Sequence, residues 1–198
     1  MDLGLKGKIA VVAASSKGLG KATARTLARE GALVTVNGRE AGTLKATADE
    51  IRSETGADVI EIVGDMTNPA DIDRLISETV EKRGGLDILV CNAGGPPSGA
   101  FSNFPEDQPW LDAVNLNLMS TLRLMRAAIP HLEARGGGSI TNIVSTSVKQ
   151  PIGHLVLSNT ARTAVRMASG VRASGAMICA TLSAAQRRAC GRWRCRCP

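Results

Sequence analysis

The chain has 198 residues, of which 43% are hydrophobic and 21% are charged. This length suits one sizeable hydrophobic core and is short for two complete domains. No apolar run approaches the roughly 18 residues of a membrane span, and no secretory leader opens the chain. We therefore expect neither a membrane protein nor an exported one.

The net charge of +6 is concentrated toward the carboxyl-terminal end. All 18 acidic residues lie at or before Glu133, whereas ten of the 24 basic residues lie beyond it, so residues 1–133 carry 14 basic groups and a net charge of −4. Four of the five cysteines lie in the same end, and the chain contains no tyrosine. The body is mildly acidic, so the high overall charge does not indicate a nucleic-acid partner.

Five short apolar runs, rich in β-branched residues, alternate with longer helical patterns over the first 165 residues. The runs cover residues 9–13, 33–36, 59–63, 86–91 and 140–144. Strands that are apolar on both faces are typical of a parallel sheet that helices cover on both sides. The sequence therefore predicts a single α/β domain with a doubly wound, Rossmann-like parallel sheet.

Two of the helical patterns carry clear end signals. One begins with Asn68 as its N-cap and Pro69 in its first position, and we expect it to end at Gly84. Another has an apolar stripe over residues 111–129, and we expect it to end at Pro130, because proline cannot continue a helix without losing a hydrogen bond.

The alternation of strands and helices fails near residue 168. We expect a nucleotide-binding domain over residues 1–168 and an aberrant basic, cysteine-rich tail over residues 169–198, which is not a domain. The tail shows no convincing sixth strand, so the last strands of the sheet are expected to be missing. The abrupt loss of acidic residues and of periodicity favours a shifted reading frame or a truncated gene.

Two binding roles for this tail are alternatives. Zinc binding by Cys190, Cys195 and Cys197 lacks a fourth ligand, and nucleic-acid binding by the tail arginines lacks a recognition motif. We therefore expect no metal and no nucleic acid. Because five cysteines with one in a core strand do not form a secreted disulfide framework, a reducing cytoplasm is the expected compartment.

The first apolar run leads into the turn ASSKGLG at residues 14–20 and then into a helix. Glycines let the backbone approach a pyrophosphate, and the helix N-terminus supplies N–H donors and positive potential. An ordinary glycine-rich turn is the alternative. If the turn holds a nucleotide, the expected cofactor contacts are Ala14, Ser16, Lys17, Gly18, Leu19 and Gly20.

The end of the second run indicates which nucleotide is bound. NAD-binding folds often place an acid there on the adenosine ribose, whereas this chain continues with Asn37 and then Arg39. A 2′-phosphate would be repelled by an acid and attracted by Arg39, with Lys17 within reach. These residues favour NADP(H) over NAD(H). Two solvated surface charges are the alternative.

Short motifs occur in order along the chain: Gly18-Leu19-Gly20 after the first run, Asp65 after the third, Asn92-Ala93-Gly94 after the fourth, Asn117 in a predicted helix and Ser145 after the fifth run. On these motifs, residues 3–168 resemble the short-chain dehydrogenase/reductase family in its 3-oxoacyl-carrier-protein-reductase-like branch. The resemblance implies cofactor contacts at Asp65, Met66, Asn92, Ala93 and Gly94. It also implies that Asn117 holds a water of the proton relay and that Ser145 is catalytic.

The chain departs from the family at its catalytic pair, Tyr-x-x-x-Lys, which follows the serine by thirteen residues. Here these positions are Ser158 and Arg162, and because the chain has no tyrosine, no shift of register restores one. The stretch Leu-Ser-Asn-x-x-Arg is similar to that of an atypical subgroup of the family. Ala14 also stands where the family usually has its first glycine.

The chemical cost of this change falls on proton transfer. A serine hydroxyl is a weaker acid than a phenol, and the serine side chain is shorter than that of tyrosine. General acid catalysis typically raises a reaction rate by about 10²- to 10⁴-fold. Arg162 keeps a permanent charge and several donors, and the resemblance implies that it holds the nicotinamide ribose. Lys149 or His154, in the loop before Ser158, is an alternative proton donor.

These features predict an NADP(H)-dependent oxidoreductase that is carbonyl or 3-oxoacyl reductase-like and acts on a small-molecule carbonyl or alcohol. A non-catalytic nucleotide-binding protein or partner subunit is one alternative, and a poorly folding remnant is another. The sequence does not identify the substrate, because the expected substrate-covering segment is absent from it. Assembly into a homo-oligomer is a further alternative to a monomer.

Overall fold

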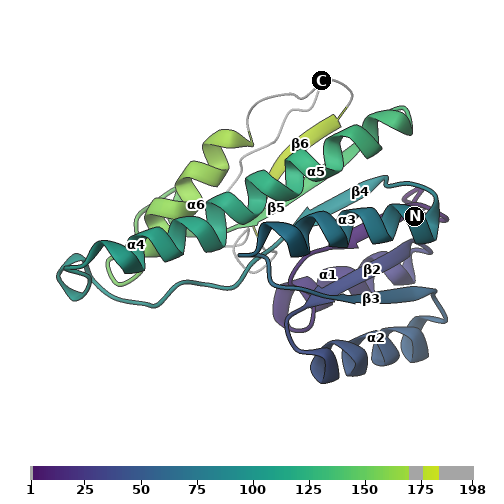
Figure 1. The fold of residues 1–198 in the computed structure, drawn as a ribbon, viewed down its shortest axis with the longest axis horizontal. Helices are drawn as coiled ribbons and strands as arrows, with labels where there is room; N and C mark the ends of the chain where they lie inside the picture. Colours follow the sequence, from purple (N-terminus) through teal and green to yellow (C-terminus); the bar gives the residue numbers. More distant parts are fainter. Residues whose placement is uncertain (1, 170–175, 183–198) are drawn as a thin grey trace.

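The computed structural model describes residues 2–169 and the backbone of residues 176–182. Its described part contains one parallel sheet with the strand order β3-β2-β1-β4-β5-β6 (Figure 1). The strands are β1 (Ile9–Val12), β2 (Leu33–Gly38), β3 (Val59–Val63), β4 (Ile88–Cys91), β5 (Gly138–Val144) and β6 (Ala176–Leu182). The order runs outward from β1 in both directions, so the predicted doubly wound parallel sheet is confirmed.

Helices cover both faces of this sheet (Figure 1). They are α1 (Gly18–Arg29), α2 (Ala41–Thr55), α3 (Pro69–Arg83), α4 (Asp107–Ala113), α5 (Ser120–Ala134) and α6 (Val156–Ala168). A π-helix, Val114–Met119, joins α4 to α5, and short 3₁₀ helices cover Phe101–Asn103 and Thr146–Val148. Within the described residues, no helix is long and apolar enough to cross a membrane.

The hydrophobic core consists of two layers, one on each face of the sheet. Neighbouring residues of β1 point to opposite faces, so Val11 packs in the layer under α3 and α5, whereas Val12 packs in the layer under α1 and α2. Leu75 and Leu44 are fully buried in these two layers. Burial of one such side chain contributes about 1.5–3 kcal/mol, so the two layers stabilise the sheet whose strand ends carry the site.

The end signals of α3 are confirmed. The Asn68 side chain accepts a hydrogen bond from the Ala70 N–H at 3.0 Å, and Pro69 occupies the first helical position. Gly84 ends the helix in the left-handed conformation, with φ at +80°.

The expectation that α5 stops at Pro130 is wrong, because the helix continues to Ala134. A proline removes one N–H from the helical ladder, but it does not prevent the following turn when that turn is held by packing. Here Leu132 is fully buried in the layer beneath α5 and holds the last turn against the sheet.

The expectation of no sixth strand is also wrong. β6 pairs in parallel with β5 from Gly138 opposite Ala176 to Val144 opposite Leu182. The run AMICATL is apolar except for one threonine, which is typical of a strand in a parallel sheet. It was not predicted as a strand because the residues around it lack the regular helical patterns that accompany the other strands. Residues 170–175 and 183–198 of the predicted tail, which include the alternative zinc ligands Cys190, Cys195 and Cys197, lie outside the described residues.

Candidate functional site

The main cavity, of about 400 Å³, lies at the carboxyl ends of the central strands. Ligands of doubly wound sheets bind at this edge, where the chain leaves neighbouring strands in opposite directions. The lining residues come from the segments after β1, β2, β3 and β4 and from the π-helix: Ala14, Ser16, Lys17, Leu19, Asn37, Gly38, Arg39, Gly64, Asp65, Met66, Asn92, Ala93, Gly94, Gly95 and Leu116.

Most residues predicted to contact a cofactor line this cavity, with Gly18, Gly20 and Arg162 as the exceptions. Gly18 and Gly20 lie at the start of α1, directly beside the lining turn. Four lining residues were not predicted from the sequence: Gly38, Gly64, Gly95 and Leu116. Gly38 ends β2 and Gly64 directly follows β3, so a glycine at a strand end was an available signal for these two.

The turn after β1 holds an unusual backbone conformation. Ala14 has a φ of +45°, which is rare for a residue with a Cβ atom. Its N–H donates to Asn37 Oδ1 at 3.1 Å, and its carbonyl accepts from Asn92 Nδ2 at 3.0 Å. A Cβ atom at Gly20 would lie 2.5 Å from the Ala14 carbonyl oxygen, so only glycine fits where α1 passes the turn.

The first turn of α1 opens toward this cavity with its backbone donors available. Lys17 is the N-cap residue, and its side chain makes no capping hydrogen bond among the described residues. The N–H groups of a first helical turn have no partner within the helix, and they carry the positive end of the helix dipole. Such a helix start can bind an anion at its N–H groups.

Two cationic side chains line the same cavity. Lys17 precedes α1, and Arg39 follows β2 with 79% of its side chain exposed. Arg39 Nη1 lies 4.0 Å from Asp65 Oδ2, which is the outer limit of an ion pair. Exposed pairs of this kind contribute little to stability, so the guanidinium is free to move to a stronger anion.

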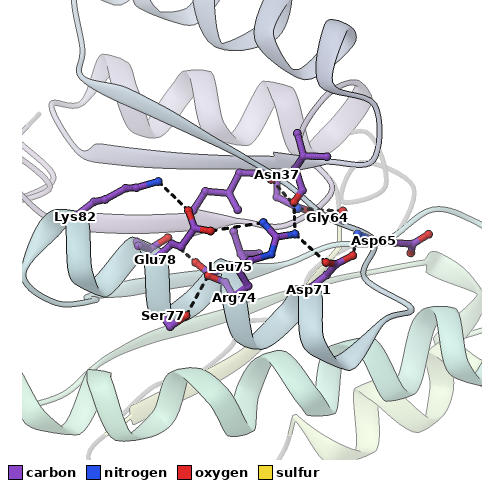
Figure 2. A network of polar contacts seen from close by, with 12 residues as sticks. Asn37, Gly64, Asp65, Asp71, Arg74, Leu75, Ser77, Glu78 and Lys82 are labelled. Carbon is purple, nitrogen blue, oxygen red and sulfur yellow. Dashed lines mark hydrogen bonds and ion pairs between the residues drawn. The ribbon is translucent and has the colours of Figure 1, made fainter.

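The acidic residue predicted at the adenine side is held firmly by its neighbours. Asp65 Oδ1 accepts from the Thr67 N–H at 2.8 Å, and the Asp65 N–H donates to Asp71 Oδ2 at 2.9 Å (Figure 2). Arg74 binds Asp71 Oδ1 at 2.8 Å and the Val63 carbonyl at 2.7 Å. The hydrogen bond from Asp65 and the Arg74 guanidinium hold the pKa of Asp71 below its usual value. The loop after β3 is therefore fixed at both ends.

The predicted catalytic residues Asn117 and Arg162 meet at one backbone carbonyl. Asn117 Nδ2 donates to the Gly94 oxygen at 2.9 Å, and Arg162 Nη2 donates to the same oxygen at 3.2 Å. Arg162 Nη1 also donates to the Ile143 carbonyl at 3.3 Å. Burial lowers the pKa of Arg162, but a guanidinium stays protonated in proteins.

A second, very small cavity lies between these two side chains. Its volume is about 10 Å³, close to the space of one water molecule. Asn117 is 3% exposed, and its Oδ1 atom has no hydrogen-bond partner among the described residues. Cys91 also lines this cavity, and burial raises the pKa of its thiol, so it stays a neutral core residue.

The two predicted catalytic serines lie near α6. Ser145 follows β5 and caps the 3₁₀ helix Thr146–Val148, its Oγ accepting from the Ser147 N–H at 3.2 Å. Ser158 lies in the first turn of α6 and is buried. Neither serine lines the main cavity. The alternative donors Lys149 and His154 are exposed in the segment between β5 and α6.

Known proteins are similar to this chain in sequence and in fold. A family model described as short chain dehydrogenase matches residues 8–174. D-beta-hydroxybutyrate dehydrogenase of Rhizobium meliloti (strain 1021) is 37% identical over 139 residues, which cover 70% of this chain and 54% of that protein. The chain spans little more than half the length of the first curated relatives it matches.

Solved structures agree with this similarity. L-Sorbose reductase from Gluconobacter frateurii, complexed with NADPH and L-sorbose, matches with a TM-score of 0.82 at 33% identity, over 85% of this chain and 64% of that one. Actinorhodin polyketide ketoreductase with NADPH matches with a TM-score of 0.82 at 30% identity, over 88% and 69%. The matched family model, together with these relatives, shows that the chain belongs to the short-chain dehydrogenase family.

Proposed function

We propose that this chain is an NADP(H)-dependent oxidoreductase that passes hydride between the nicotinamide ring and a small-molecule carbonyl or alcohol. One observation carries the proposal. The main cavity is lined by the turn before α1 together with Lys17 and Arg39, and the strand β2 that ends beside it has no carboxylate. This combination fits a pyrophosphate at the helix and a 2′-phosphate at the two cations.

The cavity fits a bound nucleotide in size as well as in charge. The cavity of about 400 Å³ lies within the range of roughly 300–1,000 Å³ that is usual for ligand sites. The uncapped first turn of α1 would hold the pyrophosphate oxygens, and Asp65 would accept a hydrogen bond from the adenine. The two matched crystal structures contain NADPH, which supports the same cofactor class.

Arg39 would provide the preference for the phosphorylated nucleotide. Its weak contact with Asp65 leaves the guanidinium available to a 2′-phosphate. A hydrogen bond to a charged group contributes about 1.5–3 kcal/mol, which corresponds to about 10- to 150-fold in affinity. We therefore expect NADPH to bind at least tenfold more tightly than NADH.

The nicotinamide ring supplies or accepts the hydride when it is bound. Arg162, anchored on two backbone carbonyls, would hold the ribose hydroxyls and stabilise negative charge on the substrate oxygen. Ser145 would polarise that oxygen by a hydrogen bond. Ser158 is a weak proton donor, so we expect tight nucleotide binding together with turnover about 10²- to 10⁴-fold below that of an enzyme with a tyrosine there.

The first experiment is a thermal melt of the full chain with saturating NADPH and, separately, NADH. A ligand at a hundredfold excess over its dissociation constant stabilises the folded state by about 2.7 kcal/mol. We expect a clear upward shift with NADPH and a small one with NADH. A shift with neither nucleotide would refute the proposed function, and equal shifts would refute the NADP(H) preference.

Variants then assign the preference to its residues. Arg39→Ala should remove most of the difference between NADPH and NADH, whereas Arg166→Ala, an exposed arginine on α6, should leave it unchanged. The rate of NADPH oxidation with a panel of ketones and 3-oxoacyl thioesters then tests catalysis. Binding without any oxidation would identify a nucleotide-binding protein that performs no hydride transfer.

A further inference from the structure

Asn37 is fully buried in the wall of the main cavity, and its side-chain amide forms hydrogen bonds with backbone groups. Its Oδ1 accepts from the Ala14 N–H at 3.1 Å, and its Nδ2 donates to the carbonyls of Ile62 at 3.0 Å and Gly64 at 3.2 Å. An amide group has two N–H donors, so both are used. Figure 2 shows Asn37 beside Gly64, next to the loop that carries Asp65.

The residue held by Asn37 Oδ1 is the strained one. Ala14 has a φ of +45°, a left-handed conformation that its Cβ atom disfavours and that glycine adopts freely. Such a conformation persists only where the surroundings hold it in place. Here Asn37 holds the N–H of Ala14, and Asn92 holds its carbonyl oxygen at 3.0 Å.

The main chain of Asn37 strengthens this connection. The Ser15 N–H donates to the Asn37 carbonyl at 2.7 Å, and the Asn37 N–H donates to Ser15 Oγ at 2.9 Å. Asn37 therefore connects two walls of the cavity. One is the turn that leads into Lys17 and α1, and the other is the loop at residues 64–65.

We propose that Asn37 is a positioning residue, which sets nucleotide affinity by keeping Ala14 in its left-handed conformation and by locking the turn before α1 to the loop after β3. The inference rests on the proposed function in that the ligand is a dinucleotide. This role differs from direct recognition of the ligand, because the Asn37 amide forms hydrogen bonds with backbone groups. Asn37 therefore acts on the ligand through Ala14.

A double-mutant cycle between Asn37→Ala and Ala14→Gly tests this role, with the dissociation constant of NADPH as the readout. Coupled neighbours typically interact by about 0.5–3 kcal/mol, or roughly 2- to 150-fold. We expect Asn37→Ala to weaken binding by about tenfold or more, and the added Ala14→Gly to restore most of it, because glycine needs no clamp. Independent effects of the two changes, with no restoration, would overturn the proposal.

A matched control separates positioning from general destabilisation. Asn68 also holds a backbone N–H with its side chain, at the start of α3, and the hydrogen bond of that side chain stays within the α3 terminus. Asn68→Ala should lower the melting temperature, and Ala14→Gly should leave any resulting loss of NADPH affinity unchanged. Restoration in this background as well would mean that Ala14→Gly acts only through overall stability, and this outcome would overturn the proposal.

A measurement without nucleotide distinguishes failure of this inference from failure of the proposed function. Ala14→Gly should raise the melting temperature more in the presence of Asn37 than in Asn37→Ala, since the unclamped alanine is free to leave the left-handed conformation. An equal rise in melting temperature in the two backgrounds would show that Asn37 does not hold Ala14 in its left-handed conformation, even if NADPH never binds. If Asn37→Ala does not fold, Asn37→Asp replaces it: it keeps the acceptor for Ala14, so restoration by Ala14→Gly there would contradict the proposal.

Discussion

Gly20 at the start of α1 gives a sharp steric prediction. A Cβ atom there would lie 2.5 Å from the Ala14 carbonyl oxygen, 2.8 Å from Ser15 Cα and 2.9 Å from Asn92 Nδ2. Two of these atoms belong to the backbone and cannot rotate away, so α1 must shift relative to the turn. Overpacking of this kind costs about 1–3 kcal/mol or more. Gly20→Ala should therefore lower the free energy of unfolding by at least this amount and displace the helix start that would bind phosphate.

Two nearby glycines serve as matched controls with different physics. Gly18 has a φ of +60°, and a Cβ atom there would meet no described atom within 4 Å, so Gly18→Ala should cost only the conformational penalty of about 1–2 kcal/mol. Gly94 has no positive φ, and a Cβ atom there would also meet no described atom within 4 Å. Gly94→Ala should leave stability nearly unchanged.

Urea unfolding of the three variants measures these differences at one temperature, and NADPH titration follows for each folded variant. We expect the loss of stability to be largest for Gly20→Ala, smaller for Gly18→Ala and near zero for Gly94→Ala. If Gly20→Ala is as stable as the unaltered chain, or if Gly94→Ala is the most damaging, the reasoning from close contacts is refuted.

Two further predictions concern charge and catalysis. Burial alone would raise the pKa of the Asp87 carboxyl, but hydrogen bonds from the Ile9 N–H and from Arg135 hold that pKa below its usual value. The resulting stability is present above about pH 4 and is lost as the pH falls through the pKa of the folded state. In urea unfolding, the free energy of unfolding of Asp87→Asn should therefore fall less steeply with decreasing pH than that of the unaltered chain. An unchanged dependence on pH would contradict this. Ser158→Ala should change the rate of NADPH oxidation by less than about threefold because an alcohol is a poor acid, whereas Arg162→Met should raise the dissociation constant of NADPH. A large rate loss in Ser158→Ala would show that the serine donates the proton.

The sequence was sufficient for the first five strands of the sheet and for most of the cavity lining. All five predicted strands occur in order, because each is an apolar run between recognisable helix signals. Most of the predicted residues after β1, β2, β3 and β4 line one cavity, since the carboxyl ends of parallel strands lie at the same edge. Such patterns depend only on residues near one another in the sequence. The parallel topology then brings the residues that follow each strand together at one edge of the sheet.

Other features depended on contacts between distant segments. β6 forms because the edge of β5 is available to it, and α5 passes Pro130 because Leu132 is buried in the core. The π-helix that carries Asn117 has no sequence signal of its own. None of these contacts is visible in the spacing of residues along the chain.

The amino-acid sequence by itself determined the order of strands and helices, the glycine turn, the cations near it and the absence of a tyrosine, because these depend on residue type and spacing. Only the tertiary structure decided what Asn37 does. Its amide reaches Ala14, 23 residues away, and Gly64, 27 residues away, so its role depends on backbone groups that come together only when the sheet has formed.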